Sequence, residues 1–593
     1  MRQVLIKFFL TYRVEALEAY LVLFAIGLSF IFPRFASKWF AKREAALAGF
    51  ARHRTLAVVT VGLLALAARL AVLPILPIPV PSIHDEFENL LMADTFSHFR
   101  LTNPPHPMRI HLETFHILQE PSYTGIVPPA QGMLLAAGRR IGGHPFVGVW
   151  LSVGMMCAAI CWMLQAWLPP PWAFLGGCLA VIRFAVFSYW SDSYWGGALA
   201  AAAGAVVLGA LPRIWKHRRI RDSVIMALGI AVLANTRPYE GFILSLPVAT
   251  GLFAWMLGGK GPSWKISMYR VVLPMGLLLT ITAGAMAYYN WRVTGSAFRT
   301  AYQVSMATVN PVPYFAWQNE RPMPVFHYKV LEDYYLQTAM PQYQKVRSLS
   351  GLTKENLIRL NRIFTFYFGI ALAFPLILAI LMGGFRAVFG GRIRFLSLCL
   401  LVTLAGLFVE VQFSPHYAAP LTGIFVAIAV QAIRYVRVWG RQSRPIGLLA
   451  MRLVPIICVY SLLNGAGQIS CGYYIATNWP NSWYSVHIGN INRSRMLAKL
   501  EEGPGRHLII VRYAVSHSVH DEWVYNDSDI DGAKVVWARD MDPVRNQELV
   551  NYFQGRHIWL LEPDKLATKL LPYPGSEGPL SSNSANSHPT GMD

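Results

Sequence analysis

Two adjacent carboxylates, Asp85 and Glu86, follow a long apolar segment in the stretch PSIHDEFENLLMADTF, residues 81–96. A carboxylate can take a proton from a hydroxyl or amine as a general base, and carboxylate oxygens also bind divalent cations. An acid pair at the end of a membrane-length segment can face both water and lipid, which favours a functional role over simple solvation of a loop. If residues 85–97 form a helix, Asp85 and Glu88 share one face, and we expect Glu88 and Asp94 to be ordinary polar residues.

A second candidate lies in the connection LANTRPYEG, where Arg237 precedes a helix-breaking proline. A short, broken apolar segment beside a charge is typical of a residue that lines a cavity. Arginine can hold a phosphate through two parallel hydrogen bonds, which lysine cannot do. An equal alternative is that Arg237 pairs with Glu240 and anchors the chain at the membrane interface.

The string HPMRIHLETFH offers His106, His111, Glu113 and His116 as metal ligands. Their spacing matches no established zinc pattern, so hydrogen bonding to a substrate or packing of the loop is favoured, and no metal site is assigned. A divalent cation therefore stays open as a cofactor, and no other cofactor is expected.

The composition of the chain indicates which kind of fold positions these residues. The 593-residue chain is 54% hydrophobic and 14% charged, with a mean hydropathy of +0.38, which is too apolar for a soluble protein. We predict a mainly α protein: a polytopic transmembrane bundle of about 11 to 13 spans with long outer loops. Twelve apolar runs have roughly the length of a span, at residues 16–33, 55–79, 144–168, 171–190, 196–212, 223–235, 242–258, 267–288, 362–382, 395–412, 417–433 and 447–467.

The net charge of +21 is concentrated in alternate connections between these runs. By the positive-inside rule those connections are cytoplasmic. The long connections, 80–143 and 289–361, then lie on the outer side together with the candidate residues. The basic residues are spread over short inner loops, so binding to nucleic acid is excluded as an explanation of the charge.

The rest of the chain divides around this bundle. Residues 1–54 are an N-terminal hydrophobic segment with a basic loop, and residues 55–470 form the membrane domain. Residues 471–572 contain three apolar runs of strand length and a helix that begins at Asp542, which predicts a small outer α/β module. The tail, 573–593, is rich in Gly, Ser, Pro and Asn and is expected to be disordered.

The stretch HDEFENLLMADTFSHFRLTNP resembles the first outer loop of the GT-C superfamily of polytopic glycosyltransferases, which includes the protein O-mannosyltransferases and the lipid A aminoarabinose transferase. Phe99 replaces a glycine of the family pattern. The strings SYWGG and RPYEG are similar to those of a bacterial branch of the superfamily.

The resemblance implies an inverting transfer of a sugar from a polyprenyl-phosphate donor to a lipid, glycan or protein acceptor. Asp85 would be the base, and Glu86 would orient the acceptor or bind a metal. The residues expected to bind substrate or the lipid phosphate are Arg237, His416, Tyr417, Glu240, His111, Glu113 and His116. His416 stands where related enzymes usually have arginine or lysine.

Two other functions fit a polytopic chain. A transporter or flippase of an envelope precursor is disfavoured by the long outer loops and by the lack of a repeat of broken helices. A non-catalytic scaffold would use the C-terminal module to hold partners. For all three functions we expect a bacterial cytoplasmic membrane, with the candidate site and the module on the outer side.

Overall fold

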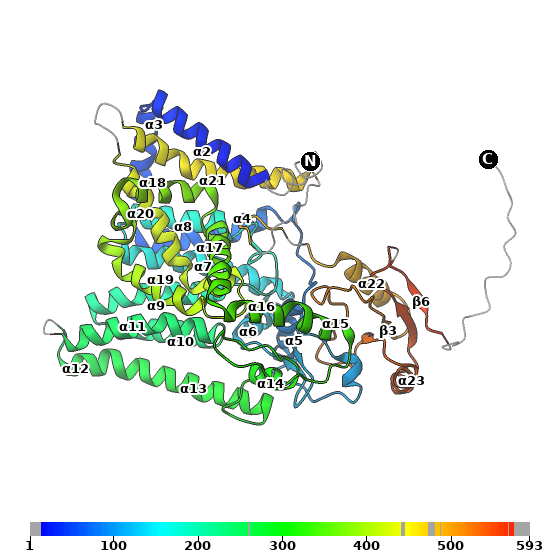
Figure 1. Cartoon of the computed structure of the whole chain (residues 1–593). Helices are drawn as coiled ribbons and strands as arrows, with labels where there is room; N and C mark the ends of the chain where they lie inside the picture. The colour runs from blue at the N-terminus through cyan, green and yellow to red at the C-terminus, as the bar shows by residue number, and fades with distance from the viewer. Residues whose placement is uncertain are drawn as a thin grey trace, which may run out of the picture.

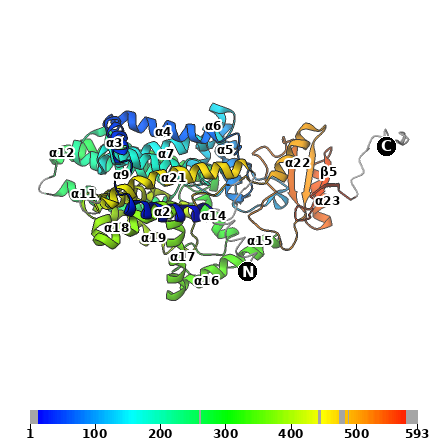
Figure 2. The ribbon, with the colours of Figure 1, turned by 90° about the horizontal axis from the view of Figure 1, so that it is seen from above.

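A computed structural model describes residues 13–258, 261–439, 445–471, 481–486, 488–566 and 568–574. Long helices form a bundle, and a small unit with a β-sheet lies beyond one end of it (Figures 1 and 2). The predicted disordered tail lies outside the described residues, apart from its first two positions.

The bundle is built from long apolar helices, and each of the twelve predicted spans coincides with one of them. Within the described residues, nine segments are long and apolar enough to cross a membrane, and α8 is a shorter apolar helix. The predicted fold class of an integral membrane bundle is therefore confirmed. The helices are α2 (Arg13–Ile31), α4 (Arg54–Ala71), α7 (Phe146–Trp167), α8 (Pro170–Phe184), α9 (Ala198–His217), α10 (Ile220–Ala234), α11 (Pro238–Leu257), α13 (Leu273–Thr294), α18 (Gly369–Phe389), α19 (Arg394–Leu407), α20 (Thr422–Val436) and α21 (Ile446–Ser470).

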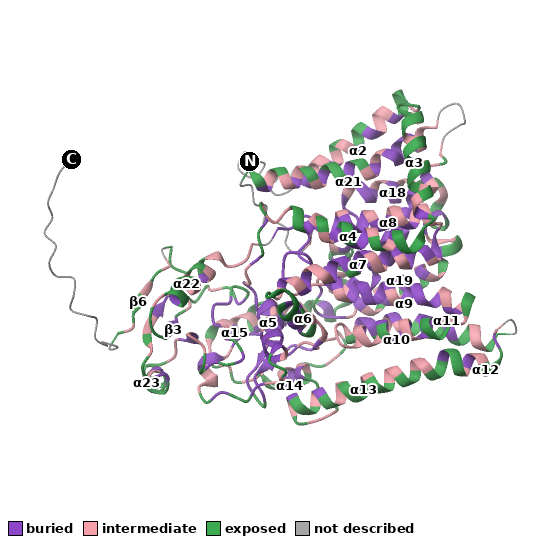
Figure 3. Ribbon diagram, turned by 180° about the vertical axis from the view of Figure 1, so that it is seen from behind, coloured by how far each residue is buried: buried purple, intermediate pink, exposed green. Residues whose placement is uncertain are grey.

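Small residues let the central helices approach closely. A Cβ added at Gly204 of α9 would lie 2.2 Å from the carbonyl oxygen of Pro420, so the two segments touch backbone to backbone. Such contacts are the usual way in which helices associate in lipid, where apolar side chains gain little from leaving their surroundings. The buried residues gather along α7, α9 and α20. Helix α13 is largely exposed, in contrast to α7 and α9 (Figure 3).

Two buried arginines inside the helices are paired with carboxylates, as expected for charges in an apolar bundle. Arg69 lies 3.1 Å from Asp192, and Arg183 lies 3.1 Å from Glu18. Asp192 belongs to the SDSYWGG turn, and its buried side chain pairs with the arginine.

The connection predicted to be the first outer loop, and called so below, begins with α5 (His84–Ser97) and continues through η1 (Arg109–Leu112), the hairpin β1 (Ile117–Leu118) and β2 (Thr124–Gly125), and α6 (Ala130–Gly142). The second contains α14 (Ala301–Thr308), α15 (Lys329–Asp333), η3 (Tyr334–Ala339), α16 (Met340–Arg347) and the start of α17 (Leu349–Tyr367). The remaining short elements are α3 (Ser37–Ala51), α12 (Trp264–Ser267), η2 (Met268–Val272), η4 (Gly391–Ile393) and η5 (Pro415–Leu421).

The C-terminal unit is a four-stranded sheet in the order β4-β3-β5-β6. Its strands are β3 (His507–Val511), β4 (Val535–Arg539), β5 (His557–Leu561) and β6 (Leu570–Pro572), with helices α22 (Ile491–Glu502) and α23 (Pro543–Tyr552). Strands β3, β4 and β5 are parallel and β6 is antiparallel. The side chain of Asp542 accepts hydrogen bonds from the backbone N–H groups of Val544 and Arg545, as predicted for the start of α23.

One face of this sheet packs on the first outer loop. Leu508 and Ile510 of β3 belong to the same buried cluster as Leu91 of α5 and Leu112 of η1. The neighbouring residues Ile509 and Val511 point to the other face, where the cluster includes Leu500 of α22. Both faces are therefore covered, as is usual for parallel strands, and the module is attached to the loop that carries Asp85.

Candidate functional site

Helix α5 places Asp85 in its first turn, at the end of the bundle that faces the module (Figures 1 and 2). The buried carboxylate of Glu86 fixes this turn, because it accepts hydrogen bonds from the backbone N–H of Ser82 at 2.9 Å and of Tyr194 at 3.3 Å. These contacts join the start of α5 to the turn SDSYWGG, residues 191–197. The two adjacent acids therefore have different surroundings. The carboxylate of Glu86 bonds backbone N–H groups, whereas that of Asp85 faces other side chains.

Two histidines and a second carboxylate surround Asp85. Its carboxylate lies 2.9 Å from Nε2 of His84 and 3.6 Å from Nδ1 of His116. The same nitrogen of His116 lies 3.4 Å from Glu88, which is one turn after Asp85 on α5. The Asp85 side chain is 24% exposed and that of Glu88 is 1% exposed, so Asp85 is the carboxylate that a substrate could reach.

Aromatic rings form the wall around this group. The ring of His84 lies 4.3 Å from those of Phe115 and His116, and 5.2 Å from that of His520. His520 follows β3 in the C-terminal module and also contacts Tyr334 of the second outer loop. The two outer loops and the module thus meet at the start of α5.

Burial and neighbouring charges move the pKa values of these groups in opposite directions. Burial alone would raise the pKa of Asp85, but His84, His116 and His416 outweigh it and hold that pKa well below its usual range. Burial and the nearby Asp85 raise the pKa of Glu88. Burial lowers the pKa of His116, and it lowers the pKa of His520 to about 4. At neutral pH we therefore expect Asp85 to be ionised, with the imidazoles of His116 and His520 uncharged.

Three of these residues also fit a metal ion. His84, Asp85 and His116 each offer one ligand atom, and these atoms lie within 4.8 Å of one another. Imidazole nitrogen with one carboxylate suits zinc and similar divalent ions better than magnesium or calcium. Such an ion would lower the pKa of a bound water or hydroxyl group.

The predicted phosphate-binding residues meet at a neighbouring position. The guanidinium of Arg237 lies 4.7 Å from the ring centre of Tyr417 and 3.7 Å from the carboxylate of Glu240. His416 is buried, and its Nδ1 lies 2.9 Å from the hydroxyl oxygen of Tyr189. The ring of Trp195 lies 4.6 Å from that of His416, so the turns SDSYWGG, NTRPYEG and QFSPHY converge.

The SDSYWGG turn connects the two groups, because the backbone N–H of Tyr194 bonds Glu86 beside Asp85 and the ring of Trp195 contacts that of His416. The arrangement brings together Asp85, His116, Arg237, Glu240, His416 and Tyr417 from segments far apart in the sequence.

Other predicted residues lie at the contact with the module. Both ring nitrogens of His111 lie 3.1 Å from backbone carbonyl oxygens, those of Arg539 and Arg545. Glu113 pairs with His327 at 2.9 Å. His111 and Glu113 are thus engaged in joining the first outer loop to its neighbours rather than grouped with Asp85.

Sequence reasoning missed His84, Glu88 and His520 as members of the site. Glu88 was expected to be an ordinary polar residue, although its position one turn after Asp85 was a usable signal. Asp94 was treated in the same way, but it is buried, pairs with Arg139 and accepts a hydrogen bond from the backbone N–H of Ser528 in the module. No local signal linked His520 to the start of α5.

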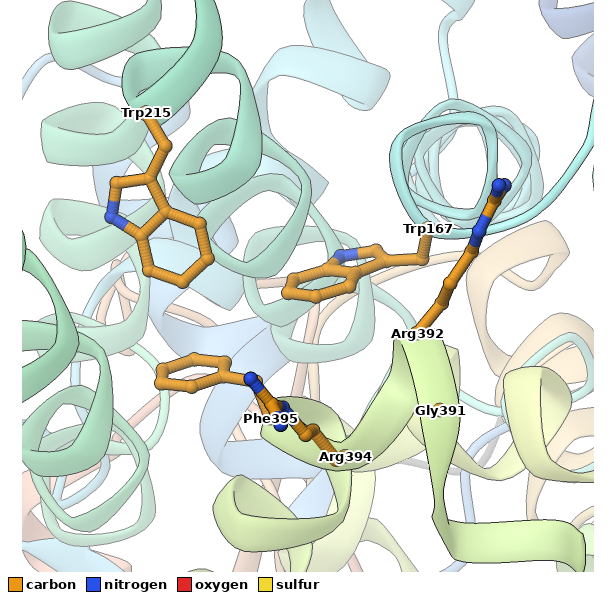
Figure 4. A pocket seen from close by; sticks show the side chains of 6 residues that line it. All are labelled: Trp167, Trp215, Gly391, Arg392, Arg394 and Phe395. Carbon is orange, nitrogen blue, oxygen red and sulfur yellow. The ribbon is translucent and has the colours of Figure 1, made fainter.

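A pocket of about 500 Å³ lies where α7, α9 and α19 meet, and its lining residues are Trp167, Trp215, Gly391, Arg392, Arg394 and Phe395 (Figure 4). Trp167 and Trp215 lie in the last turns of α7 and α9, and Arg394 begins α19, so the pocket is on the side of the basic connections. The pocket is therefore separate from the Asp85 group.

No protein-family model and no curated protein matches the chain. Among solved structures it is similar to ArnT from Cupriavidus metallidurans bound to undecaprenyl phosphate, at 13% identity and a TM-score of 0.47, covering 86% of this chain and 93% of that chain. It is also similar to the archaeal oligosaccharyltransferase AglB from Archaeoglobus fulgidus in complex with an inhibitory peptide and a dolichol-phosphate, at 11% identity and a TM-score of 0.45, covering 89% of this chain and 70% of that chain.

Proposed function

We propose that this protein is an inverting glycosyltransferase that moves a sugar from a polyprenyl-phosphate donor to an acceptor at the outer face of the membrane. The observation that carries the proposal is the position of Asp85, a partly exposed carboxylate at the end of the bundle, joined through the SDSYWGG turn to the turns that carry His416 and Arg237. The donor class follows from the family resemblance of the first outer loop.

Each group has a definite task in this reaction. Asp85 takes the proton from the acceptor hydroxyl or amine as that atom attacks the anomeric carbon. The bond to the phosphate breaks on the opposite face of the sugar, and the lipid phosphate leaves with the bonding electrons. Arg237 binds the leaving phosphate, and Tyr417 holds the guanidinium in place. Glu86 fixes the turn that aims Asp85.

The test compares cells that lack the gene with cells that produce the wild type, Asp85→Asn or the control Glu320→Gln. Glu320 is an exposed acid of the second outer loop. Mass spectrometry of lipid-linked sugars and envelope glycans is the measurement. We expect a lipid-linked sugar to accumulate without the gene and with Asp85→Asn, and to be consumed with the wild type and the control.

Two outcomes would contradict the proposal. If Asp85→Asn restores the glycans fully at a normal protein level, Asp85 is not the general base, and a non-catalytic scaffold is favoured. Exchange of an envelope precursor across reconstituted vesicles, without a glycan product, would favour a transporter.

A further inference from the structure

The pocket between α7, α9 and α19 combines positive charge with aromatic rings. Two arginines, Arg392 and Arg394, line it together with Trp167, Trp215 and Phe395 (Figure 4). Its volume of about 500 Å³ falls within the range of small-molecule sites in proteins, about 300–1,000 Å³. No carboxylate is among the described residues that line it, so the pocket favours an anion.

The two arginines of the pocket have no protein partner in the described part of the chain. Arg392 and Arg394 are both exposed, and within those residues neither side chain forms an ion pair or a hydrogen bond. Other arginines on the same side are engaged, since Arg437 and Arg452 pair with Glu44 at 2.8 Å and 2.9 Å. The guanidinium groups of the pocket are therefore free to bind a ligand.

The aromatic wall of the pocket is held in place by its neighbours. The rings of Trp167 and Phe395 are parallel with their centres 6.1 Å apart, and the ring of Trp215 meets Phe395 edge-on at 5.4 Å. Nε1 of Trp167 donates a hydrogen bond to the carbonyl oxygen of Leu208 at 3.0 Å. Phe395 packs on Gly251 of α11, where an added Cβ would lie 2.7 Å from its ring. The wall is therefore formed before any ligand binds, which lowers the entropic cost of binding.

The pocket lies at the level where the helices leave the membrane. Trp167 and Trp215 are in the last turns of two candidate membrane spans, Phe146–Trp167 and Ala198–His217. Tryptophan is enriched at the membrane–water interface, at the level of the lipid head groups. Basic pockets between membrane helices on the cytoplasmic side bind the phosphates of anionic head groups.

We propose that this pocket binds a phosphate group, presented by the head group of an anionic phospholipid in the leaflet on the basic side. Arg392 and Arg394 bind the phosphate oxygens through charge-assisted hydrogen bonds. The wall of Trp167, Trp215 and Phe395 lies against the carbon atoms next to the phosphate. This site is separate from Asp85 and does not depend on the proposed sugar transfer.

The test titrates the full-length protein in detergent with phosphatidylglycerol and counts the bound lipid by native mass spectrometry. The wild type should bind phosphatidylglycerol in preference to phosphatidylcholine, whose head group has no net charge. The double variant Arg392→Gln/Arg394→Gln should bind it about tenfold more weakly. The matched control is Arg34→Gln/Arg52→Gln, which removes two exposed arginines of another basic connection that do not line the pocket. This control should bind like the wild type.

A second measurement guards against misfolding. Phosphatidylglycerol should raise the melting temperature of the wild type and of the control but not that of Arg392→Gln/Arg394→Gln. Size-exclusion profiles without added lipid should be the same for all three proteins.

Glycerol 3-phosphate distinguishes a lipid from a soluble phosphate compound. If it fails to displace phosphatidylglycerol, the ligand is the lipid. If it binds the wild type as tightly and loses affinity for Arg392→Gln/Arg394→Gln, the same pocket takes a soluble phosphate compound. The inference is overturned if the wild type binds neither probe, if that double variant binds both as tightly as the wild type, or if the control loses as much affinity.

Discussion

Arg237 has two partners that point to different roles. Its guanidinium stacks on Tyr417, which orients a flat cation, while its distance of 3.7 Å from Glu240 is longer than that of a tight ion pair. The side chain is also 23% exposed. An arginine whose only role was to pair with Glu240 would not need to be accessible to a ligand. We therefore favour binding of the donor phosphate by Arg237.

Replacement of Arg237 by lysine separates the two roles. Lysine keeps the charge and can still pair with Glu240, but it cannot form two parallel hydrogen bonds to a phosphate. We expect kcat/KM for the lipid-linked donor to fall about tenfold or more, which corresponds to about 1.4 kcal/mol, with little change in melting temperature.

The control for this comparison is Arg299→Lys, an exposed position of the second outer loop that should leave kcat/KM unchanged. If Arg237→Lys has the kcat/KM of the wild type, the arginine only pairs with Glu240 and does not bind the phosphate.

At the scale of elements, the position of α5 depends on its contact with α6. A Cβ added at Gly132 of α6 would lie 2.7 Å from the Cβ of Met92 in α5, which is closer than two such carbons can approach. Gly132→Ala should therefore push the two helices apart and lower the stability by about 1–3 kcal/mol. Because α5 carries Asp85, sugar transfer should fall as well, which a melting curve and the glycan assay would show.

A second glycine provides the comparison. Gly284 lies in α13, and a Cβ added there would meet nothing within 4 Å. Alanine is the better helix former, so Gly284→Ala should keep activity and leave stability unchanged or slightly higher. Equal effects of the two substitutions would mean that close packing of α5 on α6 does not matter.

The elements differ in how far the sequence predicts them. Each of the twelve apolar segments is a helix, and nine of the described segments also satisfy the length rule set by the bilayer. Helix α6 is too short to cross a membrane, and its position depends on contacts such as that of Gly132 with Met92. Likewise the residues that meet Asp85 come from separate loops: His116 is brought back by a hairpin and His520 by a sheet that packs on Leu91. Such contacts have no local signature.

At the scale of the whole molecule, the two ends of the bundle carry different types of charged residue. The end with α5, the converging turns and the module carries the buried acids and histidines, and the other end carries the basic connections (Figures 1 and 2). The backbone N–H of Val80 bonds the carbonyl of Ile488, so the chain after α21 returns to the start of the first outer loop. The end of α21 is therefore on the same side as Asp85.

This arrangement predicts which cysteine an external reagent can reach. Cys471 directly follows α21 and is exposed, whereas Cys178 is half-buried and the other four cysteines are buried. If the basic connections are cytoplasmic, a membrane-impermeant maleimide should label Cys471 in intact spheroplasts, and Cys471→Ser should abolish labelling. In that background Lys42→Cys, at an exposed position of α3 on the basic side, should label only after the membrane is permeabilised. The reverse pattern would place Asp85 in the cytoplasm and rule out transfer at the outer face.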